Sequence, residues 1–393
     1  MNNSVGIEGG IASHAGRLER LYMLMERDGI DCMFLKVDGD LEYLTGIRRQ
    51  RLSATEVDQP ADFWYGAFIE KEKGVTVISP YMVGEYVKTQ VEGKPFIREL
   101  LVLPEHEDPF TYVSKALTSG RNAVRRLGVS KRLWAITLLG LQSIFPGCEI
   151  VDAGPLVNSL RRIKDAEEVR LMERAGQIVD QVFYEVVRSL RVGVTELEVA
   201  RDIDYLMQTK GAEGTSFVTG VTFEGTGKRE RTEIGRAYAV HLEPGMHVAF
   251  DFGCVYQGYC SDFGRTVYCG EPDAERAGIH RLVMEAQEEG IKAMVSGKIK
   301  ACEVDRIVRS RISEAGYGKY FWHRLGHGIG CDVHEAPFLT SSDETVLETG
   351  MCFTVEPGVF IPGFSSIRVE DVVMVTPQGG LPFSKATKDI IVV

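Results

Sequence analysis

The chain has 393 residues, which is long for one hydrophobic core, and domain-size scaling predicts two domains. Apolar residues make up 44% of it and charged residues 26%, which is typical of globular proteins and excludes a largely disordered chain. The net charge is −11, from 45 basic and 56 acidic residues, and basic clusters such as residues 48–51 are short, so the composition argues against nucleic-acid binding.

The cysteines and the first residues suggest where the protein works. None of the eight cysteines forms a C-x-x-C pair, and several lie in apolar stretches, so we expect reduced, buried thiols. Residues 1–16 lack the basic flank and apolar run of a signal peptide, and no apolar segment approaches the length of a membrane span. We therefore expect a cytoplasmic protein without membrane contact.

Residues 17–155 alternate helical and strand patterns, as an α/β domain does. The sequence predicts an amphipathic helix over residues 17–28 and a buried strand over residues 31–36. Residues 41–46 are predicted to form a second strand that leads into a loop.

A long polar stretch, residues 48–62, ends in the aromatic cluster Phe63-Trp64-Tyr65. Irregular segments of this length are usually functional, and an exposed aromatic cluster can anchor a ligand or a partner. Trp64 is therefore a candidate substrate residue. In the alternative interpretation, Trp64 and Phe68 face the N-terminal core at the start of a strand.

The pattern changes near Pro155, and we expect domains over residues 1–157 and 158–393. Residues 160–190 carry apolar side chains at helical spacing, which predicts one long helix or two at the start of the second domain.

Two later helices resemble each other. Residues 195–198 (TELE) form a capping box, and the helix they begin should end near Gly211. A similar helix that includes Glu303 and Val304 should end at Gly316, which hints at a duplicated unit.

The strongest chemical signal is residues 247–270, HVAFDFGCVYQGYCSDFGRTVYCG, which read as a β-hairpin. If Tyr256-Gln257 is a two-residue turn, Asp251 and Asp262 face each other across the ladder. Directly opposed residues have Cβ atoms roughly 4.5–5.5 Å apart, where like charges destabilise the pair. Because the flanking residues are apolar, the pair should be buried and should need neutralisation.

A second predicted hairpin repeats this arrangement, with residues 352–356 and 367–373 as strands and a turn around Gly363. Glu356 and Glu370 are symmetric about that glycine. A lone acid in a hairpin is usually a turn or rim residue, but four on two matched hairpins carry a charge of −4 that two divalent cations would cancel.

Between the hairpins lies Gly326-His327-Gly328-Ile329-Gly330, in which His327 offers an imidazole and the glycines permit close backbone approach. Oxygen-rich ligation with one histidine favours Mn²⁺, Co²⁺ or Fe²⁺ over a sulfur-rich structural zinc site. We expect two divalent ions, with Mn²⁺ the first choice and Co²⁺, Fe²⁺ or Zn²⁺ as alternatives.

At these residues the sequence resembles the pita-bread metallopeptidase superfamily, which includes Xaa-Pro aminopeptidase, prolidase and, among non-peptidases, creatinase. The resemblance covers nearly the whole chain and includes residues 29–31 and 43–46 of the N-terminal half. It implies an α/β (α+β) fold in which a smaller creatinase/prolidase-type domain precedes a pita-bread catalytic domain. The metal-ligand positions of the family are matched by Asp251, Asp262, His327, Glu356 and Glu370.

The resemblance also implies roles beside the metals. His323 and His334 match histidines that contact substrate and stabilise the tetrahedral intermediate, and Arg368 matches an arginine behind the ligands. Taken alone, each histidine has the alternative interpretation of a satisfied core or surface residue.

The sequence departs from the family in two places. Residues 217–235 lack a substrate histidine that family peptidases usually carry, and Phe360 stands where tyrosine is common. His241 and His247 could substitute for that histidine, but they flank the turn before the metal strand and fit a structural role better. Neither departure touches a metal ligand, so both put the substrate in question.

The resemblance implies a dinuclear hydrolase in which a metal-bridging hydroxide attacks the scissile carbonyl, Glu356 is the general base and Glu370 bridges the metals. The expected enzyme is an Xaa-Pro aminopeptidase or an Xaa-Pro dipeptidase (prolidase). The alternatives are a same-fold enzyme acting on a small non-peptide, either a C–N hydrolase or a dimethylsulfoniopropionate-type lyase, and an inactive peptide-binding module. Creatinase itself fits less well because the metal set is complete.

The expected partners are a small peptide or small-molecule substrate and a second copy of the chain. Related Xaa-Pro enzymes place N-terminal-domain residues over a neighbouring subunit's pocket, so the resemblance implies a homodimer in which Trp64 reaches the partner's active site.

Overall fold

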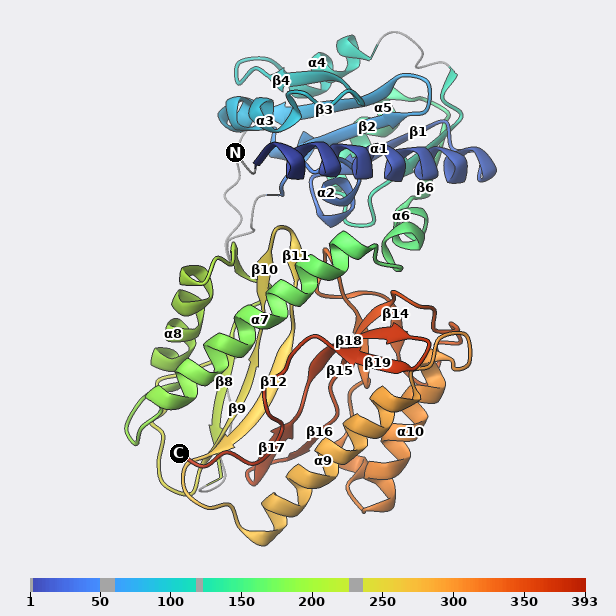
Figure 1. Cartoon of the computed structure of the whole chain (residues 1–393). Helices are drawn as coiled ribbons and strands as arrows, with labels where there is room; N and C mark the ends of the chain where they lie inside the picture. The colour runs from blue at the N-terminus through green and yellow to red at the C-terminus, as the bar shows by residue number, and fades with distance from the viewer. Residues whose placement is uncertain (1–2, 50–60, 118–122, 226–235) are drawn as a thin grey trace. The chain divides into compact units, whose positions relative to one another are not determined.

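A computed structural model of the chain describes residues 3–49, 61–117, 123–225 and 236–393 (Figure 1). The chain divides into two compact units, Met1–Arg161 and Arg162–Val393. The boundary expected after residue 157 lies inside helix α6 (Gly154–Arg161). Among the described residues, no helix is both long and apolar enough to cross a membrane. All eight cysteines are free and all but Cys148 are buried, as predicted.

The described part of the N-terminal unit contains a six-stranded mixed sheet in the order β4-β3-β2-β1-β5-β6. Strand β1 pairs antiparallel with β2 and parallel with β5. The strands are β1 (Cys32–Lys36), β2 (Gly66–Glu70), β3 (Gly74–Pro80), β4 (Ile97–Leu103), β5 (Arg126–Val129) and β6 (Glu149–Asp152). The other helices are α1 (Asn3–Arg27), α2 (Gly39–Thr45), α3 (Gly84–Val91), α4 (Pro109–Ala116) and α5 (Ala135–Ile144).

The first elements test the sequence patterns directly. The helix predicted over residues 17–28 is the C-terminal part of α1, and the buried strand predicted over residues 31–36 is β1. The strand predicted over residues 41–46 is wrong, because these residues belong to helix α2 and its cap. The carboxylate of Asp38 accepts from two backbone N–H groups at its start, and Gly46 ends it at φ 67°.

The prediction of Trp64 as an exposed anchor is also wrong. Trp64 lies in a short 3-10 helix, η1 (Asp62–Trp64), and its side chain is fully buried. Its ring meets the ring of Phe34 edge-on at 5.6 Å and that of Phe110 at 5.7 Å. The alternative interpretation, in which Trp64 and Phe68 face the N-terminal core, is confirmed. Most of the preceding polar stretch, residues 50–60, lies outside the described residues.

In the C-terminal unit, helices α7 and α8 cover one group of strands and α9 and α10 cover another (Figure 1). The sheet orders are β12-β9-β8, β14-β13-β15-β18-β19, β11-β10-β7 and β16-β17. The helices are α7 (Ala166–Ser189), α8 (Glu196–Thr209), α9 (Ala274–Ala293) and α10 (Ala301–Glu314). The strands are β7 (Gly214–Thr215), β8 (Gly220–Glu224), β9 (His247–Phe252), β10 (Cys254–Tyr256), β11 (Tyr259–Cys260), β12 (Phe263–Tyr268), β13 (Gly326–Gly328), β14 (Glu335–Leu339), β15 (Cys352–Val355), β16 (Gly358–Ile361), β17 (Ser365–Arg368), β18 (Asp371–Thr376) and β19 (Gly379–Pro382).

The two similar helices predicted in this unit are α8 and α10. Thr195 and Glu198 form the predicted capping box of α8, and the chain turns at Gly211 with φ 95°. At the start of α10 the carboxylate of Glu303 accepts from the backbone N–H of Lys300 at 2.8 Å, which is one half of such a box, and Gly316 follows the helix with φ 88°. Residues 160–190 form the end of α6 and the whole of α7, so the two-helix form of that prediction is correct.

A buried ion pair holds the start of this unit to strand β14. Lys164 Nζ lies 3.2 Å from Glu335 Oε2, and both side chains are 2% exposed. Removing the ammonium would leave a buried carboxylate without its counter-charge, so we expect Lys164→Met to lose about 3–5 kcal/mol of unfolding free energy. Urea denaturation followed by circular dichroism measures this loss.

The matched control is Lys292→Met, which makes the same change in the exposed pair with Glu288. This control should have the same urea midpoint as the wild type, because exposed ion pairs contribute little to the free energy of unfolding. Equal midpoints for the two variants would show that the Lys164–Glu335 pair does not hold the fold.

Candidate metal centre

The first ligand hairpin has a different register from the one predicted. Strand β9 pairs with β12 so that Asp251 faces Gly264, and Asp262 lies just before β12. The turn is Gln257-Gly258, with φ 46° and 84°, and not Tyr256-Gln257. A two-residue hairpin turn with positive φ at both positions favours glycine second, so the turn lies one residue later than predicted and the partner of Asp251 shifts by two residues.

The two aspartates nevertheless meet. One ligand oxygen each from Asp251, Asp262 and Glu370 lies within 4.8 Å of the others. Gly264 makes room for this cluster, because a Cβ built on it would lie 2.7 Å from Glu370 Oε2. The glycine opposite Asp251 is thus required by the close approach of the Glu370 carboxylate.

The second ligand hairpin has the predicted register. Val355 pairs with Asp371 on one side of the ligands and Gly358 with Arg368 on the other. Glu356 and Glu370 lie between these pairs, symmetric about Gly363, which has φ 71°.

His327 adds the only imidazole predicted as a ligand, on strand β13. Its Nε2 lies 3.4 Å from Glu356 Oε1 and 3.5 Å from Asp262 Oδ2, and the side chain is 2% exposed. Its Nδ1 donates to the carbonyl of Gly328 at 3.1 Å. Burial lowers the pKa of His327, so the neutral ring points the lone pair of Nε2 at the carboxylates, as metal ligation requires.

The carboxylates carry more negative charge than their surroundings neutralise. Burial, and then the charge of Asp251, raise the pKa of Asp262 to about 8. Burial, and then the neighbouring acids, also raise the pKa of Glu370 and Glu356. Asp262 Oδ1 is buried without a hydrogen-bond partner among the described residues. Only added positive charge would let all four carboxylates ionise together.

Two arginines supply part of this charge. Arg368 lies 2.7 Å from Asp251 Oδ2 and 3.4 Å from Glu370 Oε2, and Arg236 also pairs with Asp251 Oδ2. Burial alone would raise the pKa of Asp251, but these guanidinium groups outweigh it and lower that pKa. Oxygen ligands, one neutral imidazole and an uncompensated negative charge fit hard divalent cations.

The ligands line a cavity of about 920 Å³. His323 and His334 line the same cavity, and the ring centroids of His334 and His327 are 4.1 Å apart. Of the predicted site residues, only Trp64 lies elsewhere, in the core of the N-terminal unit. The sequence reasoning missed Arg236, Arg324 and Phe338, which also line the cavity and belong to no recognised motif.

His323 is held in one tautomer. Its Nδ1 donates to the carbonyl of Arg324 at 2.7 Å, and Nε2 is buried without a partner in the described structure. Burial, aided by Arg368, lowers the pKa of His323 to about 4. The ring is therefore neutral, with Nε2 an acceptor.

The two substitute histidines have structural positions. His241 donates from Nδ1 to the carbonyl of Gly193 at 2.8 Å, and His247 is fully buried with Nε2 accepting from the N–H of Ser366. Neither lines the cavity. Of the divergent segment 217–235, residues 226–235 lie outside the described residues.

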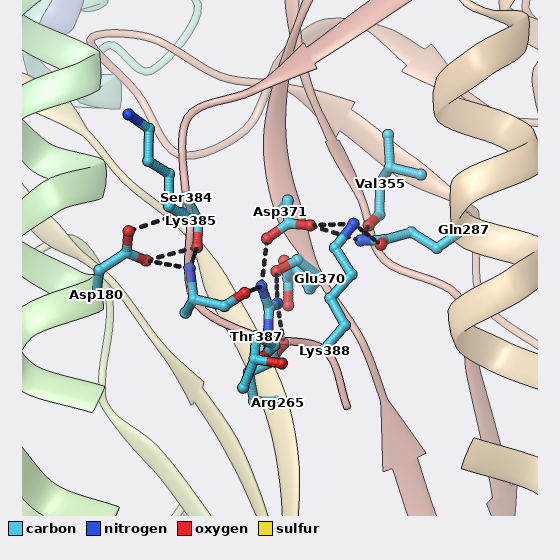
Figure 2. A network of polar contacts seen from close by, with 12 residues as sticks. Asp180, Arg265, Gln287, Val355, Glu370, Asp371, Ser384, Lys385, Thr387 and Lys388 are labelled. Atoms are coloured by element: carbon cyan, nitrogen blue, oxygen red, sulfur yellow. Dashed lines mark hydrogen bonds and ion pairs between the residues drawn. The ribbon is translucent and has the colours of Figure 1, made fainter. Parts of the chain in front are cut away.

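Behind Glu370 lies a buried polar network that the sequence did not reveal (Figure 2). Arg265 donates to the carbonyl of Glu370 at 2.6 Å and pairs with Asp371 at 2.7 Å. Asp371 also pairs with Lys388 at 2.9 Å and accepts from Gln287 at 3.2 Å. Since adjacent strand residues point to opposite faces, Glu370 faces the cavity while Asp371 anchors its backbone.

Comparisons with known proteins match this geometry. The model of metallopeptidase family M24 matches residues 170–377, and that of the creatinase/prolidase N-terminal domain matches residues 17–163. The chain is 31% identical over 376 residues to an Xaa-Pro dipeptidase of Lactobacillus delbrueckii subsp. lactis, covering 95% of this chain and 98% of that protein.

Solved structures agree over almost the full length. An Xaa-Pro dipeptidase from Bacillus anthracis is 31% identical with a TM-score of 0.82, covering 97% of this chain and 100% of that one. An X-Pro aminopeptidase from Thermotoga maritima is 28% identical with a TM-score of 0.82, covering 96% and 99%. These matches confirm the predicted fold class. A creatinase/prolidase N-terminal domain therefore precedes a catalytic domain of metallopeptidase family M24, and the chain belongs to this family of metallopeptidases.

Proposed function

We propose that the protein is a dinuclear metal-dependent Xaa-Pro peptidase that hydrolyses the peptide bond before proline. The observation that carries the proposal is the convergence of Asp251, Asp262 and Glu370, with His327 and Glu356 beside them, on one cavity whose negative charge is uncompensated. The similar Xaa-Pro dipeptidase and aminopeptidase support the substrate class. We further propose a homodimer in the cytoplasm, as the sequence suggested.

Two divalent ions, with Mn²⁺ our first choice, would be held by Asp251, Asp262, His327, Glu356 and Glu370, and would supply an acidified water and a polarised carbonyl. Glu356 is placed to accept the proton, since its raised pKa makes it a better base than an ordinary carboxylate. His323 Nε2, as an acceptor, would bind a substrate N–H. His334 is then the better candidate to donate to the oxyanion.

The cavity favours a dipeptidase over an aminopeptidase acting on longer peptides. Arg324 is exposed and lines the cavity, and its guanidinium lies 5.1 Å from the ring centroid of Phe338. No ion pair engages Arg324 within the described parts of the chain. A free C-terminal carboxylate is a natural partner for such a guanidinium. The non-peptide alternative retains one specific support, the absence of histidine from residues 217–235.

The substrate screen tests this function. Metal-reconstituted protein should hydrolyse Xaa-Pro dipeptides faster than the corresponding Xaa-Pro amides or longer Xaa-Pro peptides, because only the dipeptide offers a carboxylate near Arg324. Liberated proline or proline amide is quantified by chromatography. Turnover of small betaines or other C–N compounds in place of all peptides would replace the peptidase with the non-peptide alternative.

The metal content tests the ligand set. Because the five-ligand set that the family resemblance implies holds two ions, elemental analysis should find about two ions per chain after reconstitution. Glu370→Gln keeps the side-chain shape but removes a ligand charge, so it should lose metal and nearly all activity. Glu243→Gln, the same change at an exposed position, should retain both. A wild-type protein that stays metal-free in excess Mn²⁺, Co²⁺, Fe²⁺ and Zn²⁺ would end the two-metal proposal.

The raised pKa of Asp262 predicts how stability depends on pH in the metal-free protein. Folded Asp262 holds its proton up to about pH 8, whereas an unfolded aspartate releases it near pH 4. The folded state thus binds more protons in this window, and stability falls as pH rises. The buried histidines, whose pKa values are lowered, act in the opposite direction near pH 6.5, so we expect metal-free wild type to lose stability relative to Asp262→Asn, by on the order of 1–2 kcal/mol between pH 6.5 and 8.

Asp262→Asn retains the contribution of the buried histidines, so the melting temperature of the wild type minus that of the variant should fall across the window. Saturating metal should remove the contribution of Asp262 in the wild type. A difference between the metal-free wild type and the variant that is constant or rises from pH 6.5 to 8 would contradict the prediction.

A further inference from the structure

A second hollow of about 420 Å³ adjoins the metal cavity, and we call it the Glu224 pocket. The two spaces share five lining residues, which include the metal-cluster acid Asp251. The shared residues are Arg236, Asp251, Trp322, Phe360 and Arg368. A substrate held at the metal centre would therefore have an open path into the Glu224 pocket.

The register of β8 and β9 sets the dimensions of the pocket floor. Gly220 faces Asp251 and Glu224 faces His247, so both ends of the floor are fixed by the ladder. Residues two apart on a strand share a face, which puts Glu224 on the same face as Gly220 and hence as Asp251. Four residues at about 3.3 Å each separate the two rows by roughly 13 Å.

Glu224 brings to the far end of this floor a carboxylate that has no ion pair with a charged side chain among the described residues. Its side chain is 14% exposed, and it accepts a 2.5 Å hydrogen bond from the hydroxyl of Ser366. His247 Nε2 lies 3.9 Å away, but burial and nearby Arg276 lower the pKa of His247 to about 3, so the ring is neutral. The guanidinium of Arg276 is committed to Asp273 and to the carbonyls of Gly225 and Phe364.

Aromatic rings form one wall of the pocket. Phe360 and Trp322 lie with ring centroids 6.0 Å apart, and Trp322 is 75% exposed. A cation between aromatic faces and a carboxylate gains both from the ring quadrupole and from the ion pair. This combination selects cations over neutral apolar groups of the same shape.

We propose that the Glu224 pocket binds the basic side chain of the substrate residue whose carbonyl is attacked, so that Arg-Pro and Lys-Pro are preferred substrates. This inference rests on the proposed function. The substrate's own ammonium cannot reach Glu224, because it lies two bonds from the attacked carbon. A lysine ammonium lies six bonds away and an arginine guanidinium further, so an extended basic side chain covers about 7–9 Å, which is more than half of the floor of roughly 13 Å.

The test compares Arg-Pro with citrulline-Pro, whose side chain has nearly the same shape without the charge. Wild-type protein should show a kcat/KM at least about tenfold higher for Arg-Pro, as expected for a charged hydrogen bond in a sheltered site. Glu224→Gln should abolish that preference by lowering kcat/KM for Arg-Pro to about the value for citrulline-Pro. Glu243→Gln, with the same loss of charge at an exposed position, should keep the preference.

The outcomes separate this inference from the proposed function. Equal turnover of Arg-Pro and citrulline-Pro by the wild type overturns the Glu224 pocket and leaves the peptidase intact. If neither dipeptide is cleaved, the proposed function fails, and calorimetric titration of both dipeptides into metal-free protein still decides the pocket. Equal dissociation constants of Arg-Pro and citrulline-Pro would refute the Glu224 pocket. Because both dipeptides are compared on the wild-type protein, the test holds even if Glu224→Gln does not fold.

Discussion

The buried carboxylate cluster is the constraint that organises the C-terminal unit. Asp251, Asp262 and Glu370 bring ligand oxygens within 4.8 Å of one another inside an apolar shell. Burial and mutual repulsion oppose their joint ionisation, as the raised pKa values of Asp262 and Glu370 show. Such an arrangement survives only if the backbone cannot relax outward, so rigidity must come from the surrounding strands and their polar anchors.

That rigidity is visible on the opposite face of the same strand. Asp371 follows Glu370 directly, yet its surroundings reverse the sign of the pKa shift. Burial opposes its ionisation, but Arg265 and Lys388 outweigh burial and lower its pKa. Arg265 also holds the carbonyl of Glu370, and Lys388 comes from the C-terminal tail, whose residues 384–386 are bound by Asp180 of α7 (Figure 2). The carboxylate of Asp371 on one face is therefore fully neutralised within the described structure, whereas the carboxylates around Glu370 on the other face keep a net negative charge.

The sequence predicted those features that depend on local chemistry. The symmetry of Glu356 and Glu370 about Gly363 was readable because the turn residues and the strand pattern agree. The predicted turn of the Asp251 hairpin lies one residue too early, and the predicted partner of Asp251 is wrong by two residues, because either Tyr256-Gln257 or Gln257-Gly258 could form the turn and only backbone φ decides. The prediction that Trp64 is exposed is wrong because an aromatic residue after a polar stretch has the same sequence pattern whether its side chain is exposed or buried. Arg265, Gln287 and Lys388 could not be found, because their contacts with Asp371 join distant segments.

Phe360, which stands where the family commonly has tyrosine, lies on the wall of the cavity and is not a metal ligand, and the charge constraint explains why such a position can vary. A ligand exchanged for a neutral residue would upset the balance of the whole cluster, whereas an aromatic wall tolerates change at little cost. Phe360 keeps ring contacts with Trp322 and His323 and lies 5.6 Å beneath the guanidinium of Arg368, so it offers the packing of a tyrosine without its hydroxyl. The chemistry of the centre is thereby fixed by electrostatics, and what it acts on is set by residues free to vary around it.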